Sequence, residues 1–241
     1  MLQADKFTTI LLQASLFTPG LRLNTANLFM FLMGEYGDSF NGEPTLNGQM
    51  EKVPSPFNVP VLMLQNAAKS IKLSASHERL DLFRDEESTA QESDAFLLWA
   101  VDLLSKYASF NKTRVGRLAL IAQRVTPSAN PAIELSRHFC QERWTNTAIN
   151  RPQDFELHSH KCFKMGELFD VNSWVRCKTA IKREPEVAGV NKANLVLVEQ
   201  DINSLGEAAD IRDIPEAELR RFFPEAMIEM AKVLALYFPT I

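Results

Sequence analysis

The sequence lacks the features by which several classes of protein are recognised. Its 241 residues include only three cysteines, Cys140, Cys162 and Cys177, and no two of them are close together. An odd number of separated cysteines argues against a disulfide framework and favours a reducing, cytoplasmic setting. The longest apolar runs are shorter than about 20 residues or contain charges, so we expect neither a transmembrane helix nor a membrane partner.

Motifs for the common chemistries are also missing. There is no Walker pattern, no dinucleotide-binding fingerprint and no nucleophile elbow in the chain. The net charge of −4, with 46% hydrophobic residues, is ordinary for a globular protein and does not favour one that coats nucleic acid. The sequence therefore favours a non-enzymatic protein without a cofactor, although it does not exclude an enzyme.

What the chain does contain is an internal similarity. Segment 11–19 is an apolar stretch that ends in Thr-Pro, and segment 119–127, which lies 108 residues further on, is similar. A helical stretch, a run of strands and a long apolar helix follow in both places. A period of this length is typical of two packed structural halves. We therefore expect a first half at 1–110 and a second at 111–241, with one continuous pseudo-dimeric domain as the alternative.

The hydrophobic pattern predicts the elements of each half. Strands are predicted at 7–17, 61–64, 71–76, 80–82, 115–125, 155–165, 175–182 and 195–198. Helices are predicted at 24–33, at 95–107 after a Ser93 or Asp94 cap, from 130 to 144, and near the C-terminus. Pro224 is expected to split or kink the last helix, since an internal proline costs roughly 3 kcal/mol.

This order predicts an α+β fold made of two pseudo-repeats of strand, helix, antiparallel strands and helix. Helices are expected to cover each sheet on one face, and the two sheets could join edge to edge. Residues 37–60, rich in glycine and proline, predict a long loop that is a candidate contact region. The alternative is a surface connection without a role.

The doubled order of elements resembles the TATA-binding-protein-like fold over nearly the whole chain. DNA-binding members of that family present a basic concave sheet with paired phenylalanines that enter the minor groove. This chain departs from them in its acidic balance and its lack of matched phenylalanine pairs. Segments 114–120 and 197–201 are similar to those of a sporadically distributed, uncharacterised bacterial family. That resemblance implies an accessory protein of a bacterial cluster, with a defence or mobile cluster as one alternative.

Three residues spaced by two, His158, His160 and Cys162, are the candidate metal ligands. On a strand they point to one face, and imidazole and thiolate are good zinc ligands, but a structural site needs four. His138 and Cys140 diverge by about 200° on a helix and cannot easily complete the set. The alternative is a polar strand face, so no metal is expected. A metal hydrolase that uses His158 and His160 is a minor hypothesis.

Positive charge is concentrated between residues 111 and 124, which hold Lys112, Arg114, Arg117 and Arg124 and no acid. The candidate contacts for nucleic acid or for a protein partner are Arg114, Arg117, Lys178 and Lys182. Three aromatic side chains could stack bases there: Phe163, Phe169 and Trp174. The acidic pair Glu199 and Asp201 shares a strand face and could hold Mg²⁺, or could simply be solvated.

The favoured hypothesis is a cytoplasmic, non-enzymatic accessory or assembly subunit of a bacterial multiprotein complex. Its proposed contacts are the polar face of the sheet and the loop at 37–60. The alternative is a nucleic-acid-binding protein that uses a basic strand face. A homo-oligomer is compatible with either hypothesis.

Overall fold

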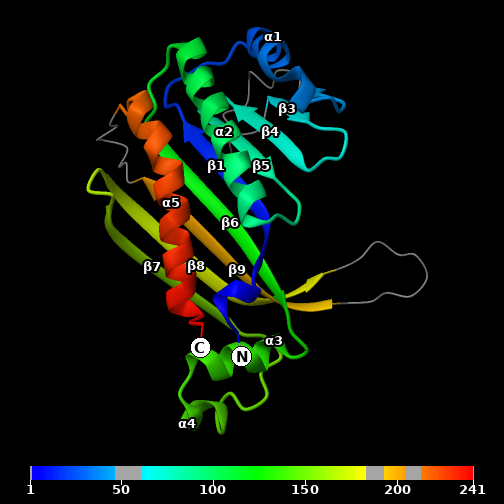
Figure 1. The fold of residues 1–241 in the computed structure, drawn as a ribbon, viewed down its shortest axis with the longest axis vertical. Helices are drawn as coiled ribbons and strands as arrows, with labels where there is room; N and C mark the ends of the chain where they lie inside the picture. Colours follow the sequence, from blue (N-terminus) through cyan, green and yellow to red (C-terminus); the bar gives the residue numbers. More distant parts are fainter. Residues whose placement is uncertain (1, 47–60, 183–192, 205–212, 241) are drawn as a thin grey trace, which may run out of the picture.

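Nine antiparallel strands form one twisted sheet in the computed structural model, which describes residues 2–46, 61–182, 193–204 and 213–240 (Figure 1). The described strands are β1 (Thr8–Phe17), β2 (Thr45–Leu46), β3 (Leu62–Gln65), β4 (Ile71–Ser76), β5 (Arg79–Arg84), β6 (Arg117–Pro127), β7 (Glu156–Met165), β8 (Phe169–Lys182) and β9 (Ala193–Ser204). The described helices are α1 (Thr25–Tyr36), α2 (Ala90–Asn111), α3 (Pro131–Phe139), α4 (Glu142–Thr145) and α5 (Glu216–Tyr237), with short 3₁₀ turns η1 (Ala4–Lys6) and η2 (Gly37–Ser39). The prediction of an antiparallel α+β fold is confirmed.

The strand order is β2-β3-β4-β5-β1-β6-β9-β8-β7. The two long strands β1 and β6 are neighbours at the centre, with Leu12 opposite Ala122 and Phe17 opposite Arg117. Two strands lie at the edges, the short β2 and the ten-residue β7. The first and second parts of the chain therefore contribute to one continuous sheet.

Helices lie on one face of this sheet, where they bury its apolar side chains (Figure 1). Leu12 and Leu16 of β1 and Leu118 and Leu120 of β6 are fully buried in a core that also contains side chains of α1, α2 and α5. Because strand side chains alternate between faces, the residues between these leucines point to the opposite side. Helix α3 packs against β8 and β9 with Leu135, in a second, smaller cluster. Among the described helices, none is long and apolar enough to cross a membrane.

Helix α2 begins earlier than the sequence pattern suggested. Its N-cap is Thr89, whose Oγ1 accepts a hydrogen bond from the Glu92 backbone N–H at 3.2 Å. The Glu92 carboxylate in turn accepts from the Thr89 backbone N–H at 2.8 Å. This reciprocal arrangement is a capping box, and its Thr-x-x-Glu spacing was present in the sequence. The prediction of a cap at Ser93 or Asp94 was therefore wrong.

The last helix is also longer than expected. Helix α5 continues through Pro224, where the proline removes one backbone hydrogen bond. Phe222, Phe223 and Ala226, on both sides of the proline, are fully buried. Burying a side chain such as phenylalanine contributes roughly 1.5–3 kcal/mol, so packing on both sides offsets the cost of the proline.

Two further expectations differ in part from the structure. The helix predicted from 130 to 144 is interrupted, because α3 ends at Phe139 with Cys140 in an extended conformation. Helix α4, which follows, buries none of its residues, so no packing holds the two segments in one helix. Of the predicted loop at 37–60, the structure describes η2, β2 and the residues between them, and 47–60 lie outside the described residues.

Candidate binding surface on the open face of the sheet

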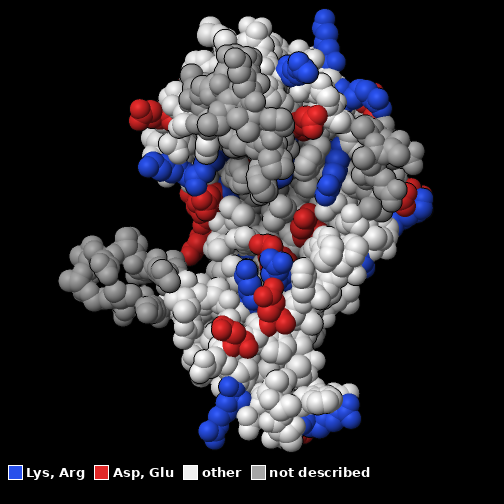
Figure 2. All heavy atoms as spheres, turned by 180° about the vertical axis from the view of Figure 1, so that it is seen from behind, with Lys and Arg blue, Asp and Glu red and all other residues white. Residues whose placement is uncertain are grey.

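The face of the sheet opposite the helices is covered by no described helix, and we call it the open face. Figure 2 shows the molecule from this side, with basic and acidic side chains next to one another near the middle. The strand register places alternate residues of every long strand on this face. In the central row, Ser15 lies between Asp81 on β5 and Ala119 on β6, and Asn203 on β9 lies between Ala119 and Asn172.

A buried carboxylate organises one side of the open face. The Asp81 side chain, in a residue that is 8% exposed, accepts hydrogen bonds from Gln13 Nε2 at 3.0 Å and from Ser15 Oγ at 2.5 Å. Arg79 Nε donates to the same oxygen at 2.8 Å. Hydrogen bonds to an ionised acceptor are stronger than neutral ones, so this cluster fixes the side chains of β1 and β5.

A second chain of hydrogen bonds crosses β9, β8 and β7. Asn203 Nδ2 donates to Asp201 at 3.1 Å, and Asn172 Nδ2 donates to Asn203 at 3.3 Å. The Asn172 carbonyl oxygen then lies 3.0 Å from His160 Nε2 and 3.1 Å from Cys162 Sγ. Burial raises the pKa of Asp201, and the Asn203 hydrogen bond and the nearby Arg117 charge partly oppose this. The open face is thus linked laterally over three strands.

An aromatic ring between two guanidinium groups lies where the two halves of the face meet. Arg79 and Arg117 lie 4.9 and 5.1 Å from the centre of the Phe17 ring, from the strands on either side of β1. Cation–π contacts of this kind contribute about 0.5–1 kcal/mol at exposed sites. Arg117 therefore connects the Phe17 ring to the Asp201 side of the face.

Towards the other end of the face, opposite charges alternate. Arg176 Nε lies 2.9 Å from Glu156, and its Nη1 lies 3.7 Å from Glu199. Gln123 Nε2 donates to the other oxygen of Glu199 at 2.8 Å. Trp174 is 36% exposed, and its ring stacks on His160 with 4.0 Å between ring centres. The surface combines paired charges with an accessible aromatic ring.

The predicted basic residues do not form one strip. Arg117 and Lys178 lie on the open face, while Arg114 lies in the loop before β6. Arg124 lies on the helix side and is buried, because it stands seven positions after Arg117 and strand side chains alternate between faces. Lys182 ends β8, and its side chain is outside the described part of the structure. Of the four candidate contacts, the structure thus brings Arg117 and Lys178 to the open face, and their role in binding stays a prediction.

The aromatic candidates separate in the same way. Phe169 is buried and Phe163 packs against the main core on the helix side, so only Trp174 reaches the open face. Glu199 and Asp201 share that face as expected, and each is engaged with neighbouring polar side chains.

The candidate metal ligands do lie on one face of β7. His158, His160 and Cys162 are exposed, with 3.7 Å between Cys162 Sγ and His160 Nε2. Within one copy of the chain, the described residues contain no group of three His, Cys, Asp or Glu side chains that could hold a metal ion. His138 lies under α5, where its Nε2 is 2.6 Å from the Tyr237 carbonyl oxygen, and Cys140 ends α3.

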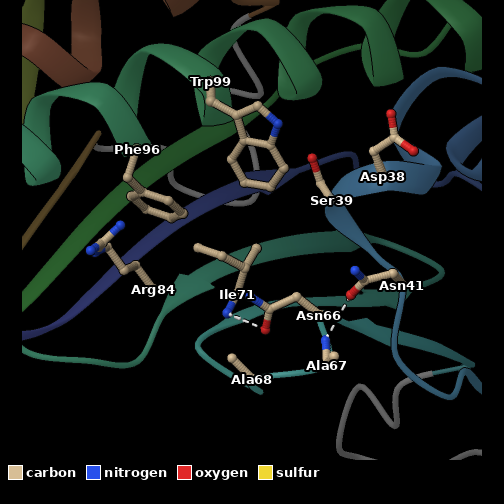
Figure 3. A pocket seen from close by; sticks show the side chains of 10 residues that line it. All are labelled: Asp38, Ser39, Asn41, Asn66, Ala67, Ala68, Ile71, Arg84, Phe96 and Trp99. Atoms are coloured by element: carbon tan, nitrogen blue, oxygen red, sulfur yellow. Dashed lines mark hydrogen bonds between the residues drawn. The ribbon is translucent and has the colours of Figure 1, made fainter.

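A separate hollow of about 440 Å³ lies on the helix side, between α2 and the turn joining β3 to β4 (Figure 3). Trp99 and Phe96 form one wall, and Asn66 and Ile71 face them. The polar groups of this wall already have partners, since Asn66 Oδ1 accepts from the Ile71 N–H at 3.1 Å. Arg84, at one end, pairs with Glu86 at 2.9 Å. The buried Nε of Arg84 has no hydrogen-bond partner among the described residues.

Sequence reasoning missed the charged residues Asp81, Arg79 and Arg176 of the network and also its uncharged members. Gln13 and Ser15 alternate with Leu12, Ala14 and Leu16 in β1, and this alternation was the signal that could have placed them on an exposed face. Asn172 and Asn203 carry no comparable signal, because their pairing depends on strand register. Comparisons of the chain with family models, with curated proteins and with solved structures found no match.

Proposed function

We propose that this protein is a non-enzymatic accessory subunit that docks another protein on the open face of its sheet. The observation that carries the proposal is the open face itself. It extends over the long central strands, is covered by no described helix and carries hydrogen-bonded polar side chains, with Trp174 accessible among them. Tryptophan and arginine are enriched where protein interfaces gain their binding energy.

The distribution of charge favours a protein partner over a nucleic acid. Binding to phosphates depends on cationic side chains that displace counterions along the backbone. Here Arg79 is paired with Asp81, and Arg176 with Glu156 and Glu199. A face of alternating sign instead suits a partner with complementary charges, which sets specificity and association rate.

We further propose that the two halves of the chain are equivalent units. The halves follow the same order, and each places its last strand (β5 or β9) beside its first (β1 or β6). Gln13 pairs with Ile121, and these positions differ by 108, which is also the separation of the two Thr-Pro segments. A two-fold axis through this pair would exchange the halves.

The test uses the full-length protein and the products of neighbouring genes. We expect a stable heteromeric complex in light scattering, and we expect Arg176→Glu on the open face to abolish it. Leu98→Ala, on the exposed side of α2, is the matched control and should leave the complex intact.

Failure to form any heteromeric complex would refute the docking proposal. Salt-dependent binding of the purified chain to single- or double-stranded nucleic acid, weakened by Arg117→Ala, would instead support the nucleic-acid alternative.

A further inference from the structure

The edge strand β7 carries the inference, which goes beyond the docking proposed above. All ten residues of β7 pair with β8, and no other described strand lies on its outer side. Such an edge presents unpaired backbone N–H and C=O groups that can accept a further strand. The opposite edge, β2, has only two residues in the described structure. An additional strand would therefore extend the sheet at β7.

The sequence of β7 is complementary to itself when it is reversed about His160. Antiparallel pairing with a second copy, centred on this residue, places Glu156 opposite Lys164 and Leu157 opposite Phe163. Opposite charges and apolar side chains facing each other across strands stabilise the pairing. Moving the centre one residue towards the C-terminus places Lys161 opposite its own copy, which is unfavourable.

The same pairing brings the candidate metal ligands of two copies together. His158 of one copy lies directly opposite Cys162 of the other, and His160 lies on the two-fold axis. Directly opposite residues have Cβ atoms about 4.5–5.5 Å apart, so their side chains can share one ion.

Two ligands of each site are already close together within one copy. Cys162 Sγ and His160 Nε2 are 3.7 Å apart. Tetrahedral zinc with bonds of about 2.3 Å to sulfur and 2.0–2.1 Å to nitrogen needs its ligands about 3.6 Å apart. In a single copy both atoms lie 3.0–3.1 Å from the Asn172 carbonyl oxygen, and zinc would replace the hydrogens that they donate to it.

We propose that two copies pair through β7 and that the pairing creates two symmetric zinc sites. Each site consists of Cys162 and His160 of one copy and His158 of the second copy. Three protein ligands leave a fourth position for water. A single copy supplies too few ligands, which agrees with the absence of a three-ligand group among its described residues. The two open faces would then become one continuous surface.

The test measures the mass of the full-length protein by size-exclusion chromatography with light scattering, with added zinc and with EDTA. We expect twice the chain mass of 27.2 kDa with zinc, and the chain mass with EDTA. Elemental analysis should find about one zinc ion per chain in the dimer. His158→Ala should abolish both zinc binding and dimer formation, since it removes the ligand that each copy contributes to the site of the other.

A charge exchange tests the strand register without touching a ligand. Lys164→Glu should give a monomer in the presence of zinc, and the double variant Glu156→Lys with Lys164→Glu should restore the dimer. Lys72→Glu, on the same face but on β4 and away from β7, is the control and should remain dimeric. Circular dichroism confirms that each variant is folded.

Three results would overturn the proposal. A chain that stays monomeric with zinc excludes the pairing. Zinc bound by a monomer and unaffected by His158→Ala excludes the shared site. A dimer that survives Lys164→Glu excludes this register of β7.

Discussion

Replacing Gln200 with leucine tests how a buried positive charge is held in the core. Arg124, which is 6% exposed, lies on the helix side of β6. Its Nη1 donates a short hydrogen bond to Gln200 Oε1, and its Nη2 lies 3.7 Å from Met227 Sδ. Gln200 Nε2 donates onward to the Met230 carbonyl oxygen at 2.9 Å. These two partners of the guanidinium are neutral, and Gln200 is the stronger acceptor.

The expected effect follows from the cost of burying the charge. Burial lowers the pKa of Arg124 to about 10, which corresponds to about 3 kcal/mol against the charged form. Without the Gln200 oxygen, that charge also loses its main hydrogen bond, and such bonds contribute about 1.5–3 kcal/mol. We therefore expect Gln200→Leu to lower the free energy of unfolding by about 3 kcal/mol. The melting temperature should fall by roughly 6–12 °C.

Removing the charge should remove most of this penalty. In an Arg124→Met background, Gln200→Leu leaves no buried guanidinium without an acceptor, so we expect it to cost about 1 kcal/mol. Urea unfolding of the wild type, both single variants and the double variant gives the coupling between the two residues. A coupling of about 2 kcal/mol is expected. Additive losses would contradict the reasoning, because Gln200 would then act independently of the charge.

Three further predictions concern single residues. Thr89→Ala removes the acceptor at the start of α2 and should cost about 1 kcal/mol in urea unfolding, while an unchanged midpoint would mean that the capping box is not needed. Burial raises the pKa of the Cys177 thiol to about 12, so iodoacetamide at pH 8 should alkylate the exposed Cys162 well before Cys177. Mass spectrometry can follow the two reactions, and equal rates of alkylation would contradict the buried position of Cys177. Because burial raises the pKa of Asp201, the wild type loses stability as the pH rises through that pKa, and Asp201→Asn avoids this loss. The variant should therefore be more stable than the wild type at neutral pH, and their free energies of unfolding should converge below about pH 4. A difference in stability that grows in acid would contradict the raised pKa of Asp201.

Local patterns in the sequence were enough to place most elements of the fold. In β8, alternation predicted which residues face the core, and Val175 and Cys177 are indeed buried while Arg176 and Lys178 are not. Alternation of this kind reports the two faces of a strand directly, because side chains point to each face in turn. The antiparallel arrangement followed from runs of strands between helices.

Properties that depend on pairing between distant segments could not be predicted. Asp81 and Ser15 meet only because β5 and β1 are neighbours in a particular register, which neither segment encodes alone. The basic stretch from 111 to 124 looked continuous in the sequence. The start of β6 at Arg117 then separated a loop residue, Arg114, from a face residue and from the buried Arg124.

A partner on the open face should gain more binding energy at Trp174 than at Asp81. The Asp81 carboxylate already accepts three hydrogen bonds and is 8% exposed, so a partner could engage it only by displacing bonds that the fold supplies. Trp174 is 36% exposed, and its ring is already ordered by stacking on His160. A partner that binds this ring therefore loses little free energy to side-chain ordering.

Trp174→Ala should therefore weaken partner binding by about 2 kcal/mol, or roughly 30-fold in Kd, as measured by calorimetry. Met63→Ala, at an exposed position on the same face near its other end, should change the Kd by less than about threefold. Equal losses of binding free energy at Trp174 and Met63 would mean that the whole face contributes evenly. The ordered ring of Trp174 would then have no special role in binding.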